Sequence, residues 1–470
     1  MQFHNTLTRK TETFKPRKAG NVSLYTCGPT VYNYYHIGNL RNAVFNDTLR
    51  RALSLSGYEV KHVMNITDVG HLVSDADIGE DKLEKGARAE GKTVFEVAEH
   101  YTRAFKSDMN ELNVQPPNGY HSHKHHDTYA RATDFIPEQI EMIQILVKKG
   151  FAYQTEQAIY FDVQKLPDYG RLTGQKLADK ETGARDQVVT DSAKHHPQDF
   201  AVWFFTIGRY ADHSMYWPSP WGDGFPGWHL ECSAIIHATL GDPIDIHTGG
   251  VDHIGTHHPN EMAQTEAAYG DSLANFWIHN EFILVNGTKM SKSKGNAYIL
   301  SQIKEHGFTT MALRLLYLEA HYRTELNFSF ESLTASTNTL RGLMSWAELL
   351  YQPDILPTPD NSQSTKFREA ISGSLADDLD TPGALARLHE FASAYAPTQA
   401  LLEFLDEAFA LNLSLVRDLP VRDKQTILDR ETARHSKDWS RSDQIREHLE
   451  KSGIALEDTP SGPRWKRLGL

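Results

Sequence analysis

Alternating apolar and polar positions mark the first recognisable unit of the chain. The segment NVSLYTC alternates as a strand that ends at Cys27, and GPT then predicts a turn. Residues 36–58 (HIGN to SGY) carry apolar positions at helical spacing and predict an amphipathic helix that ends at Gly57. YEVKHVMNITDV predicts the next strand. Strand, glycine turn, helix and strand form a βαβ unit, which implies a parallel sheet with ligands at the carboxyl ends of its strands.

The middle of the chain interrupts this pattern and then restores it. Residues 93–149 are helical in pattern, 151–162 predict a pair of hairpin strands, and polar sequence continues to residue 196. QDFAVWFF, DIHTGG and NFWIHNEFILV predict further strands, while WHLECSAIIHATLG and HPNEMAQTEAAYG predict helices. The parallel-sheet domain is therefore predicted to be split by an insertion. Beyond about residue 330 the pattern is helical as far as Lys451, with a fresh helix start at Asp380-Thr381-Pro382.

Charge and cysteine usage narrow the class of protein. The 470 residues include 48 basic and 61 acidic side chains, a net charge of −13, which argues against wrapping nucleic acid by overall charge but permits local basic patches. The cysteines are Cys27 and Cys232, and MQFHNTLTRK has no apolar core of a signal peptide. No apolar run approaches the roughly 18 residues of a membrane span. We expect a cytoplasmic protein without a membrane partner.

The two cysteines have neighbours that suggest a metal site. His257 and Glu261 lie four positions apart in a helical pattern, hence on one face, and Cys232 lies in the preceding predicted helix. Together with Cys27 they offer two thiolates, an imidazole and a carboxylate, which suit Zn²⁺. His258 competes with His257 because it is three positions from Glu261. The alternative is that both cysteines are simply buried apolar side chains.

Two short motifs suit phosphate. HIGN opens a helix directly after a strand, where free backbone N–H groups and the helix dipole attract anions, and His36 can donate to phosphate oxygens. Its alternative is a surface histidine that caps a helix. VNGTKMSKSKGN sets Lys289, Lys292 and Lys294 among small residues, which suits the growing charge of a departing pyrophosphate. Its alternative is a solvated basic loop.

A third motif suits a nucleotide sugar. Gly249, Gly250 and Asp252 follow a predicted strand, where glycines admit a nucleotide and a carboxylate can hold a ribose hydroxyl. A plain turn is the alternative. The chain has no GxxxxGK[ST] and no clear GxGxxG, so ordinary kinase and dehydrogenase functions lose support.

HIGN near the start and KMSKS after the split sheet resemble the class I aminoacyl-tRNA synthetases. YTCGPTVYNYYHIGN, NITDV, PGWHLECSA, DIHTGGVD, HHPNE and KMSKSKGN, in this order, resemble the cysteinyl-tRNA synthetase family within that class. The similarity runs from HNTLTR through ARHSKDWSRSDQIREHL to GIALEDTP, so it covers nearly the whole chain. The resemblance implies activation of L-cysteine by ATP with Mg²⁺, transfer to tRNA(Cys), and no editing domain.

The resemblance also implies roles for individual residues. One Zn²⁺ per chain would be held by Cys27, Cys232, His257 and Glu261, with the first histidine of the pair as the ligand. The expected catalytic residues are His36, Asn39, Lys289 and Lys292; the expected ATP-binding residues are these four with Gly38, Gly249, Gly250 and Asp252. The expected substrate-binding residues are Gly28, Thr67, Trp228, His229 and His247, and the expected tRNA-binding residues are Arg464, Trp465 and Lys466.

The chain departs from the family pattern at three places. Asn39 stands at the fourth position of the HIGH motif, Thr248 stands where many relatives have glycine, and NITDVGHL lacks the usual acidic pair. Asn39 can donate a hydrogen bond but carries no charge, so weaker polarisation of phosphate is the largest effect we expect. None of the three removes a proposed metal or phosphate ligand.

The predicted fold is α/β: a Rossmann-like parallel-sheet catalytic domain split by an insertion, then an all-α helical bundle domain and a small C-terminal anticodon-binding tail. The predicted bounds are 1–118 and 199–280 for the two catalytic halves, 119–198 for the connective insertion, 281–330 for the KMSKS-containing stem-contact region, 331–420 for the bundle and 421–470 for the tail. We expect a monomer.

Three rival functions remain. A cysteine:amino-sugar ligase of mycothiol synthesis resembles the catalytic half but lacks the tail, where Trp465 between Arg464 and Lys466 suits stacking on an unpaired base. Core packing is the alternative for Trp465. A non-catalytic RNA-binding paralogue would show degraded motifs, and the motifs are intact. A zinc hydrolase typically has three protein ligands and a bound water at its zinc ion, whereas this chain offers four protein ligands.

Overall fold

The computed structural model describes residues 1–70, 72–74, 78–174, 193–290, 295–352, 355–460 and 462–469. These residues fold into two compact units. The first unit contains residues 1–283, 291–300 and 322–325, and the second contains 284–290, 301–321 and 326–470. Among the described residues, no helix combines the length and the apolar character that a membrane span requires.

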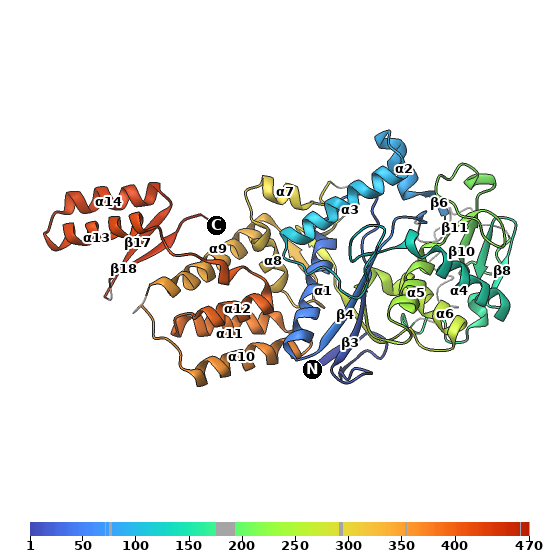
Figure 1. Cartoon of the computed structure of the whole chain (residues 1–470), viewed down its shortest axis with the longest axis horizontal. Coiled ribbons are helices and arrows are strands. Elements are labelled where there is room, and N and C mark those ends of the chain that lie inside the picture. The colour runs from blue at the N-terminus through green and yellow to red at the C-terminus, as the bar shows by residue number, and fades with distance from the viewer. Residues whose placement is uncertain are drawn as a thin grey trace. The chain divides into compact units, whose positions relative to one another are not determined.

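A five-stranded parallel sheet forms the centre of the first unit (Figure 1). Its order is β13 (Ala274–Asn280), β12 (Ile244–Gly250), β3 (Asn21–Thr26), β4 (Glu59–Ile66) and β7 (Ala130–Arg131). Helix α1 (Ile37–Leu55) connects β3 to β4 and packs against β4. The predicted βαβ unit is therefore confirmed, and the carboxyl ends of β3, β4 and β12 meet at one edge because Thr26 pairs with both Met64 and Thr248.

The region predicted as helical over residues 93–149 is instead two helices with irregular chain between them. Helix α3 (Val94–Glu111) ends before Pro116 and Pro117, and α4 (Ile136–Lys149) follows the short 3-10 turn η1 (Ala132–Phe135). The backbone of Asn113 is left-handed, with φ 54°, which ends the right-handed helix, and Pro116 and Pro117 cannot donate the backbone hydrogen bonds of a further turn.

A second, antiparallel sheet joins part of the predicted insertion to the chain that follows it. The order of its four strands is β11 (Gly224–Pro226), β10 (Phe200–Phe205), β9 (Ala158–Phe161) and β8 (Ala152–Gln154). The predicted hairpin over residues 151–162 is thus β8 and β9. QDFAVWFF forms β10, which pairs with β9 and β11 rather than with the parallel sheet, so this antiparallel sheet crosses the predicted boundary at residue 199.

Two further helices of the first unit begin near the carboxyl edge of the parallel sheet. They are α5 (Trp228–Thr239) and α6 (His257–Tyr269), and both match predicted helices. The other elements of this unit are β1 (Gln2–Asn5), β2 (Lys10–Thr13), β5 (Leu72–Ser74), β6 (Ile78–Asp81), α2 (Lys82–Glu90), η2 (Val163–Lys165), η4 (Gly208–Tyr210) and η5 (Val251–Gly255).

NFWIHNEFILV, predicted as one strand, forms two strands in different sheets. Its first part is β13, and its second part is β14 (Ile283–Val285), which lies between β15 (Thr288–Lys289) and β16 (Leu326–Phe328). The backbone N–H of Glu281 donates to Tyr322 O instead of continuing the β13 ladder. Long-range pairing of this kind is not encoded in the local alternation of the segment.

The second unit is mainly helical, as predicted. Its elements are α7 (Leu300–Glu305), α8 (Thr310–Leu318), α9 (Phe330–Ala347), η7 (Glu348–Tyr351), α10 (Asn361–Ala376), α11 (Thr381–Ala394), α12 (Gln399–Phe409), η8 (Leu413–Leu415), α13 (Val421–His435), α14 (Trp439–Lys451), β17 (Ile454–Thr459) and β18 (Gly462–Arg467). The Asp380 side chain caps α11 by accepting from Gly383 N at 2.9 Å, which explains the predicted start there. Strands β17 and β18 form an antiparallel hairpin at the C-terminal end.

Candidate active site and metal cluster

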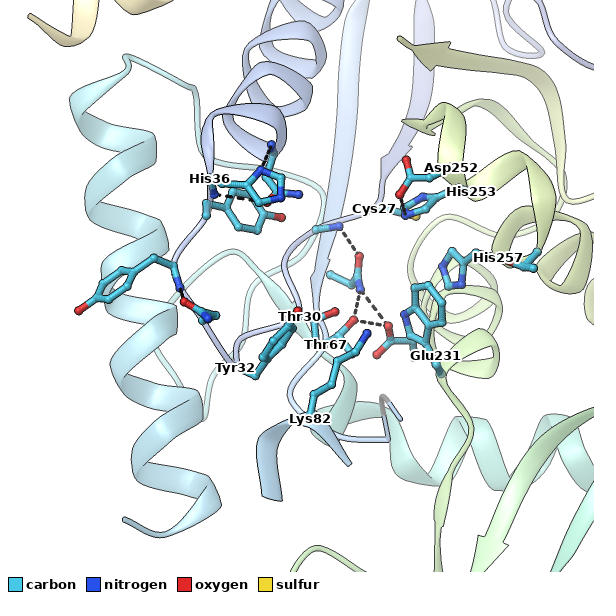
Figure 2. A pocket seen from close by; sticks show the side chains of 18 residues that line it. Cys27, Thr30, Tyr32, His36, Thr67, Lys82, Glu231, Asp252, His253 and His257 are labelled. Atoms are coloured by element: carbon cyan, nitrogen blue, oxygen red, sulfur yellow. Dashed lines mark hydrogen bonds and ion pairs between the residues drawn. The ribbon is translucent and has the colours of Figure 1, made fainter. Parts of the chain in front are cut away.

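A cavity of about 270 Å³ opens at the carboxyl edge of the parallel sheet (Figure 2). It lies where β3 ends and where α1, α5 and α6 begin. Such an edge is where open α/β sheets bind ligands. The residues that line it are Cys27, Gly28, Thr30, Tyr32, Asn33, Tyr34, Tyr35, His36, Asn39, Asn65, Thr67, Lys82, Trp228, Glu231, Asp252, His253, Thr256 and His257.

The four predicted metal ligands converge beside this cavity, and Cys27 and His257 line it. The donor atoms of Cys27, Cys232, His257 and Glu261 all lie within 4.8 Å of one another, and all four side chains are buried. Cys232 Sγ lies 3.6 Å from His257 Nε2, and Cys27 Sγ lies 3.9 Å from Glu261 Oε1. His257 Nε2 and Glu261 Oε1 are 2.6 Å apart, as the i, i+4 spacing on α6 predicts.

A second donor set shares two of these residues. Cys27, His247, His258 and Glu261 also bring four donor atoms within 4.8 Å. His258 Nε2 lies 3.4 Å from Cys27 Sγ, and its Nδ1 lies 2.8 Å from His279 Nε2. The two sets differ in access, because Cys27 and His257 both line the cavity whereas Cys27 is the only cavity-lining member of the set with His258.

His229 and His247 were expected to line the amino-acid pocket, but the structure places them behind the ligands. His229 Nδ1 is 3.0 Å from His257 Nδ1, so the nitrogen of His257 that faces away from the cluster has a partner. His247 Nε2 is 2.6 Å from Glu261 Oε2, while Oε1 of the same carboxylate faces His257. Hydrogen bonds of this kind orient ligands and tune their basicity.

The electrostatics of the cluster favour the ionised forms of Glu261 and Cys27 and oppose ionisation of Cys232. Burial alone would raise the pKa of Glu261, but the charges of His257 and His247 lower it to about 2. Burial also opposes ionisation of Cys27, yet a hydrogen bond from Cys232 and the charge of His258 bring the pKa of the Cys27 thiol well below its usual value. Burial raises the pKa of Cys232, and the neighbouring Cys27 raises it further. A bound divalent cation would favour ionisation of both thiols.

The HIGN motif forms the N-terminus of α1. His36 is the N-cap residue: its Nδ1 accepts from Asn39 N at 3.3 Å, and Asn39 Oδ1 accepts from His36 N at 3.4 Å. An acceptor Nδ1 places the proton of the neutral ring on Nε2, which is then a donor. Asn39 uses its carbonyl oxygen in this capping box and keeps its amide group as a donor. The helix-capping alternative and the phosphate role are therefore compatible.

Only some of the other residues predicted to bind ATP line the cavity. Asp252 lines the cavity, whereas Gly249 and Gly250 end β12 outside its lining, as does Gly38 in the first turn of α1. A Cβ atom on Gly249 would lie 2.6 Å from His253 Nδ1, so this glycine makes room for imidazole rings. Lys289 ends β15 and is exposed. Lys292 lies outside the described residues, as do Ser291, Ser293 and Lys294.

A polar network that was not predicted forms another wall of the cavity. Gly28 N donates to Asn65 Oδ1 at 2.8 Å, and Asn65 Nδ2 donates to Glu231 Oε1 at 3.2 Å. The Thr67 hydroxyl donates to the same carboxylate oxygen. A Cβ atom on Gly28 would lie 1.9 Å from Asn65 O, so glycine is required for this close approach. Burial raises the pKa of the Glu231 carboxyl well above its usual value.

Two sequence signals could have identified this network. Asn65 lies at the carboxyl end of the predicted second strand, and Glu231 lies three positions after Trp228 on a predicted helix, hence on the same face. Lys82 and His253, which also line the cavity, carry no such signal. They reach it through loop and helix placement that only the tertiary structure defines.

Comparison with known proteins defines the family. Residues 13–338 match the model of the tRNA synthetases class I (C) catalytic domain. A cysteine–tRNA ligase of Treponema denticola is 38% identical over 502 residues, with 100% of both chains covered. The cysteine–tRNA ligase 1 of Burkholderia lata is 42% identical over 473 residues, covering 99% of this chain and 96% of that one. This chain belongs to the cysteine–tRNA ligase family. The expected family and its ligase class are confirmed.

Solved structures of other class I synthetases share the fold of this cysteine–tRNA ligase family member. Mycobacterium tuberculosis methionyl-tRNA synthetase in complex with methionyl-adenylate gives a TM-score of 0.57 at 15% identity and covers 84% of this chain and 88% of that one. The Agrobacterium radiobacter K84 agnB2 LeuRS in a ternary complex with tRNA gives 0.58 at 13% identity, with 86% of each covered. The predicted α/β fold class is confirmed.

The tail of this cysteine–tRNA ligase family member corrects one expectation. Trp465 is only 4% exposed and packs with Leu419, Ile427, Ile445, Leu449, Ile454 and Leu456, so core packing describes it and its indole face is not offered to a base. The alternation of β18 points Trp465 inward, while Lys466 is exposed and Arg464 is half-buried. Trp439, at the start of α14, is 56% exposed, and the Arg434 guanidinium lies 5.9 Å from its ring centroid.

Proposed function

We propose that this chain activates L-cysteine with ATP to cysteinyl-adenylate and then transfers cysteine to the 3′ end of tRNA(Cys). The observation that carries the proposal is the meeting of two features in one cavity. Cys27 and His257, from the buried donor cluster, line it together with His36 and Asn39 from the HIGN helix start. A cluster of soft ligands suits recognition of a thiol, and a helix N-terminus suits phosphate.

A zinc ion suits the donor set that contains Cys232. Tetrahedral zinc with bonds of about 2.0–2.3 Å has neighbouring donor atoms about 3.5 Å apart. Cys232 Sγ and His257 Nε2 at 3.6 Å and Cys27 Sγ and Glu261 Oε1 at 3.9 Å are close to that spacing, whereas His257 Nε2 and Glu261 Oε1 at 2.6 Å would have to separate to share an ion. When bound, zinc would take the substrate thiolate in addition to, or in exchange for, one of the four protein ligands. A serine hydroxyl is a poorer zinc ligand, and alanine has no ligand atom in its side chain. Selection by coordination is consistent with the absence of a predicted editing domain.

The chemistry assigned to the cavity has two balanced steps. In the first, a carboxylate oxygen of cysteine bonds to the α-phosphorus of ATP while the bond from that phosphorus to the bridging oxygen breaks and pyrophosphate leaves. In the second, a terminal ribose hydroxyl of tRNA bonds to the activated carbonyl carbon, loses its proton, and AMP leaves. His36 Nε2–H and the Asn39 amide would donate to phosphate oxygens, and Mg²⁺ would accompany ATP.

The remaining assignments rest on the family and stay predictions. Asp252 would hold the ribose, Trp228 would cover the adenylate, and Lys289 and Lys292 would bind the phosphates as pyrophosphate departs. Gly38, Gly249 and Gly250 would admit ATP, and Gly28 and Thr67 would contact the amino acid. We also propose a monomer in the cytoplasm.

Trp439 is proposed as a tRNA contact in place of Trp465. Trp439→Ala is expected to raise the KM for tRNA about 5- to 160-fold, because stacking of a base on an aromatic ring contributes roughly 1–3 kcal/mol. ATP–pyrophosphate exchange should be unchanged. The contrasting variant is Trp465→Ala, which opens a cavity in a buried core and should lower the thermal stability of the protein. Equal KM values for the Trp439 variant and the unmodified protein would contradict the assignment.

The decisive test of the function is charging of a transcript with the cysteine anticodon by the purified protein, ATP, Mg²⁺ and zinc. Charging with cysteine but not with serine is the expected result. Activation of cysteine without transfer to tRNA would favour the amino-sugar ligase. No activation would favour the non-catalytic paralogue, and either of these outcomes would overturn the proposal.

A further inference from the structure

Glu231 has one carboxylate oxygen that its surroundings leave without a partner. The side chain is 2% exposed and its Oε1 accepts from both Asn65 and Thr67. Within the described part of the chain, Glu231 Oε2 is buried and has no hydrogen-bond partner. An unmatched buried carboxylate oxygen costs free energy unless a ligand supplies a donor.

The position of Glu231 connects it to the substrate cavity. Glu231 and Trp228 lie three residues apart on the first turn of α5, so they present one face of the helix, and both line the cavity. Figure 2 shows the Glu231 carboxylate directed toward Thr67. Two of the four clustered donors, Cys27 and His257, line this cavity as well. The Glu231 carboxylate and the expected thiol-binding residues therefore border one cavity.

We propose that Glu231 binds the α-ammonium group of the amino-acid substrate, and that Asn65 and Thr67 are positioning residues for its carboxylate. This inference rests on the proposed function, which places a cysteine in the same cavity. An α-ammonium group is protonated at neutral pH because its pKa is about 8. It brings three donors and the positive charge that a buried carboxylate requires.

The covalent geometry of cysteine supports this assignment. The thiol and the ammonium group stand on adjacent carbons, so their binding groups must lie close together, and Cys27, His257 and Glu231 line the same cavity. The substrate carboxylate must face the phosphates, which the His36 and Asn39 wall would hold. A ribose hydroxyl could also donate to Glu231, but it carries no charge to offset that of the carboxylate.

Lys82 is a lysine of the same cavity that could compete with a substrate ammonium group for Glu231. It lines the cavity, and its Nζ lies 5.6 Å from the centroid of the Tyr32 ring. If Lys82 neutralised Glu231, a substrate ammonium group would gain little binding free energy from the same carboxylate. The substrate test below distinguishes the two cases, because only a substrate-binding carboxylate discriminates between ligands that differ in the amino group.

The experiment compares L-cysteine with 3-mercaptopropionate, which is cysteine without its amino group. Dissociation constants of both ligands are measured by calorimetry on zinc-loaded protein, before and after Glu231→Gln. The unmodified protein should prefer cysteine by about 10- to 100-fold, the range of a hydrogen bond to a charged group. In the variant this preference should disappear, while binding of 3-mercaptopropionate and the zinc content stay unchanged.

A matched control is Glu84→Gln. Glu84 is another buried carboxylate of the first unit, accepts from Ser214 N at 2.7 Å, and is not among the cavity-lining residues. This variant should keep the preference for cysteine. If Glu231→Gln does not fold, Glu231→Asp retracts the carboxylate by one methylene group and should reduce the same ratio.

Two outcomes would overturn the inference. A parallel loss of both ligands would assign Glu231 a purely structural role, and an unchanged ratio would show that it does not contact the amino group. Neither result would contradict the proposed function if the unmodified protein charges tRNA with cysteine. A protein that fails to charge tRNA and binds neither ligand would instead refute the proposed function.

Discussion

Replacing Cys232 by serine is expected to release zinc and abolish cysteine activation. The serine hydroxyl keeps the shape of the side chain but is a weak zinc ligand, so the affinity for zinc should fall by at least about 100-fold, since loss of outer-shell partners alone costs 10- to 100-fold. Zinc content measured by atomic emission and cysteine-dependent ATP–pyrophosphate exchange should fall together. Because Cys232 is buried, the variant should be compared with the metal-depleted unmodified protein.

The control for this prediction comes from the second donor set. His258→Gln removes a member of the set with His247 but leaves Cys27, Cys232, His257 and Glu261 in place. At saturating zinc this variant should retain one ion per chain. The reverse pattern, with zinc kept by Cys232→Ser and lost by His258→Gln, would place the metal in the other set and overturn the proposed ligand assignment.

Substitution of His36 by asparagine is expected to lower the rate of ATP–pyrophosphate exchange about 100- to 1,000-fold, the range for loss of one preorganised donor. Asparagine is a preferred N-cap residue, so it can still accept from Asn39 N and hold the first turn of α1. The variant should therefore fold normally, bind zinc and lose mainly kcat. Steady-state exchange kinetics with thermal unfolding check both points.

A comparison with His36→Ala distinguishes the contribution of His36 to capping α1 from its contribution to phosphate binding. Alanine removes the imidazole and also the cap, which contributes about 1 kcal/mol. Both variants should lose exchange activity equally, and only the alanine variant should melt at a lower temperature. If asparagine restores the activity that alanine loses, His36 serves as a cap alone and its phosphate role is wrong.

Local periodicity was sufficient to predict the elements that build the parallel sheet. NVSLYTC, the helix after HIGN and YEVKHVMNITDV became β3, α1 and β4 because apolar spacing and helix caps are local signals. The i, i+4 pair of His257 and Glu261 was predictable for the same reason. Where a signal depended on long-range pairing, prediction was wrong: β10 joined the sheet of the insertion, and NFWIHNEFILV split between two sheets.

Burial and partner choice were decided only by the tertiary structure. In the sequence, Trp465 stands between two cations. In the structure, its indole is buried in a hydrophobic core formed with residues of α13, α14 and β17, and no local sequence pattern predicts that burial. The histidines show the same limit: His229 and His247 lie behind the clustered donors His257 and Glu261 because distant helices and strands meet there. By itself the sequence determined the family, the order of local elements and the chemical identity of the cluster. The tertiary structure decided which polar groups share a cavity and left Glu231 with an oxygen to offer a ligand, because hydrogen-bond satisfaction depends on neighbours far apart in the chain.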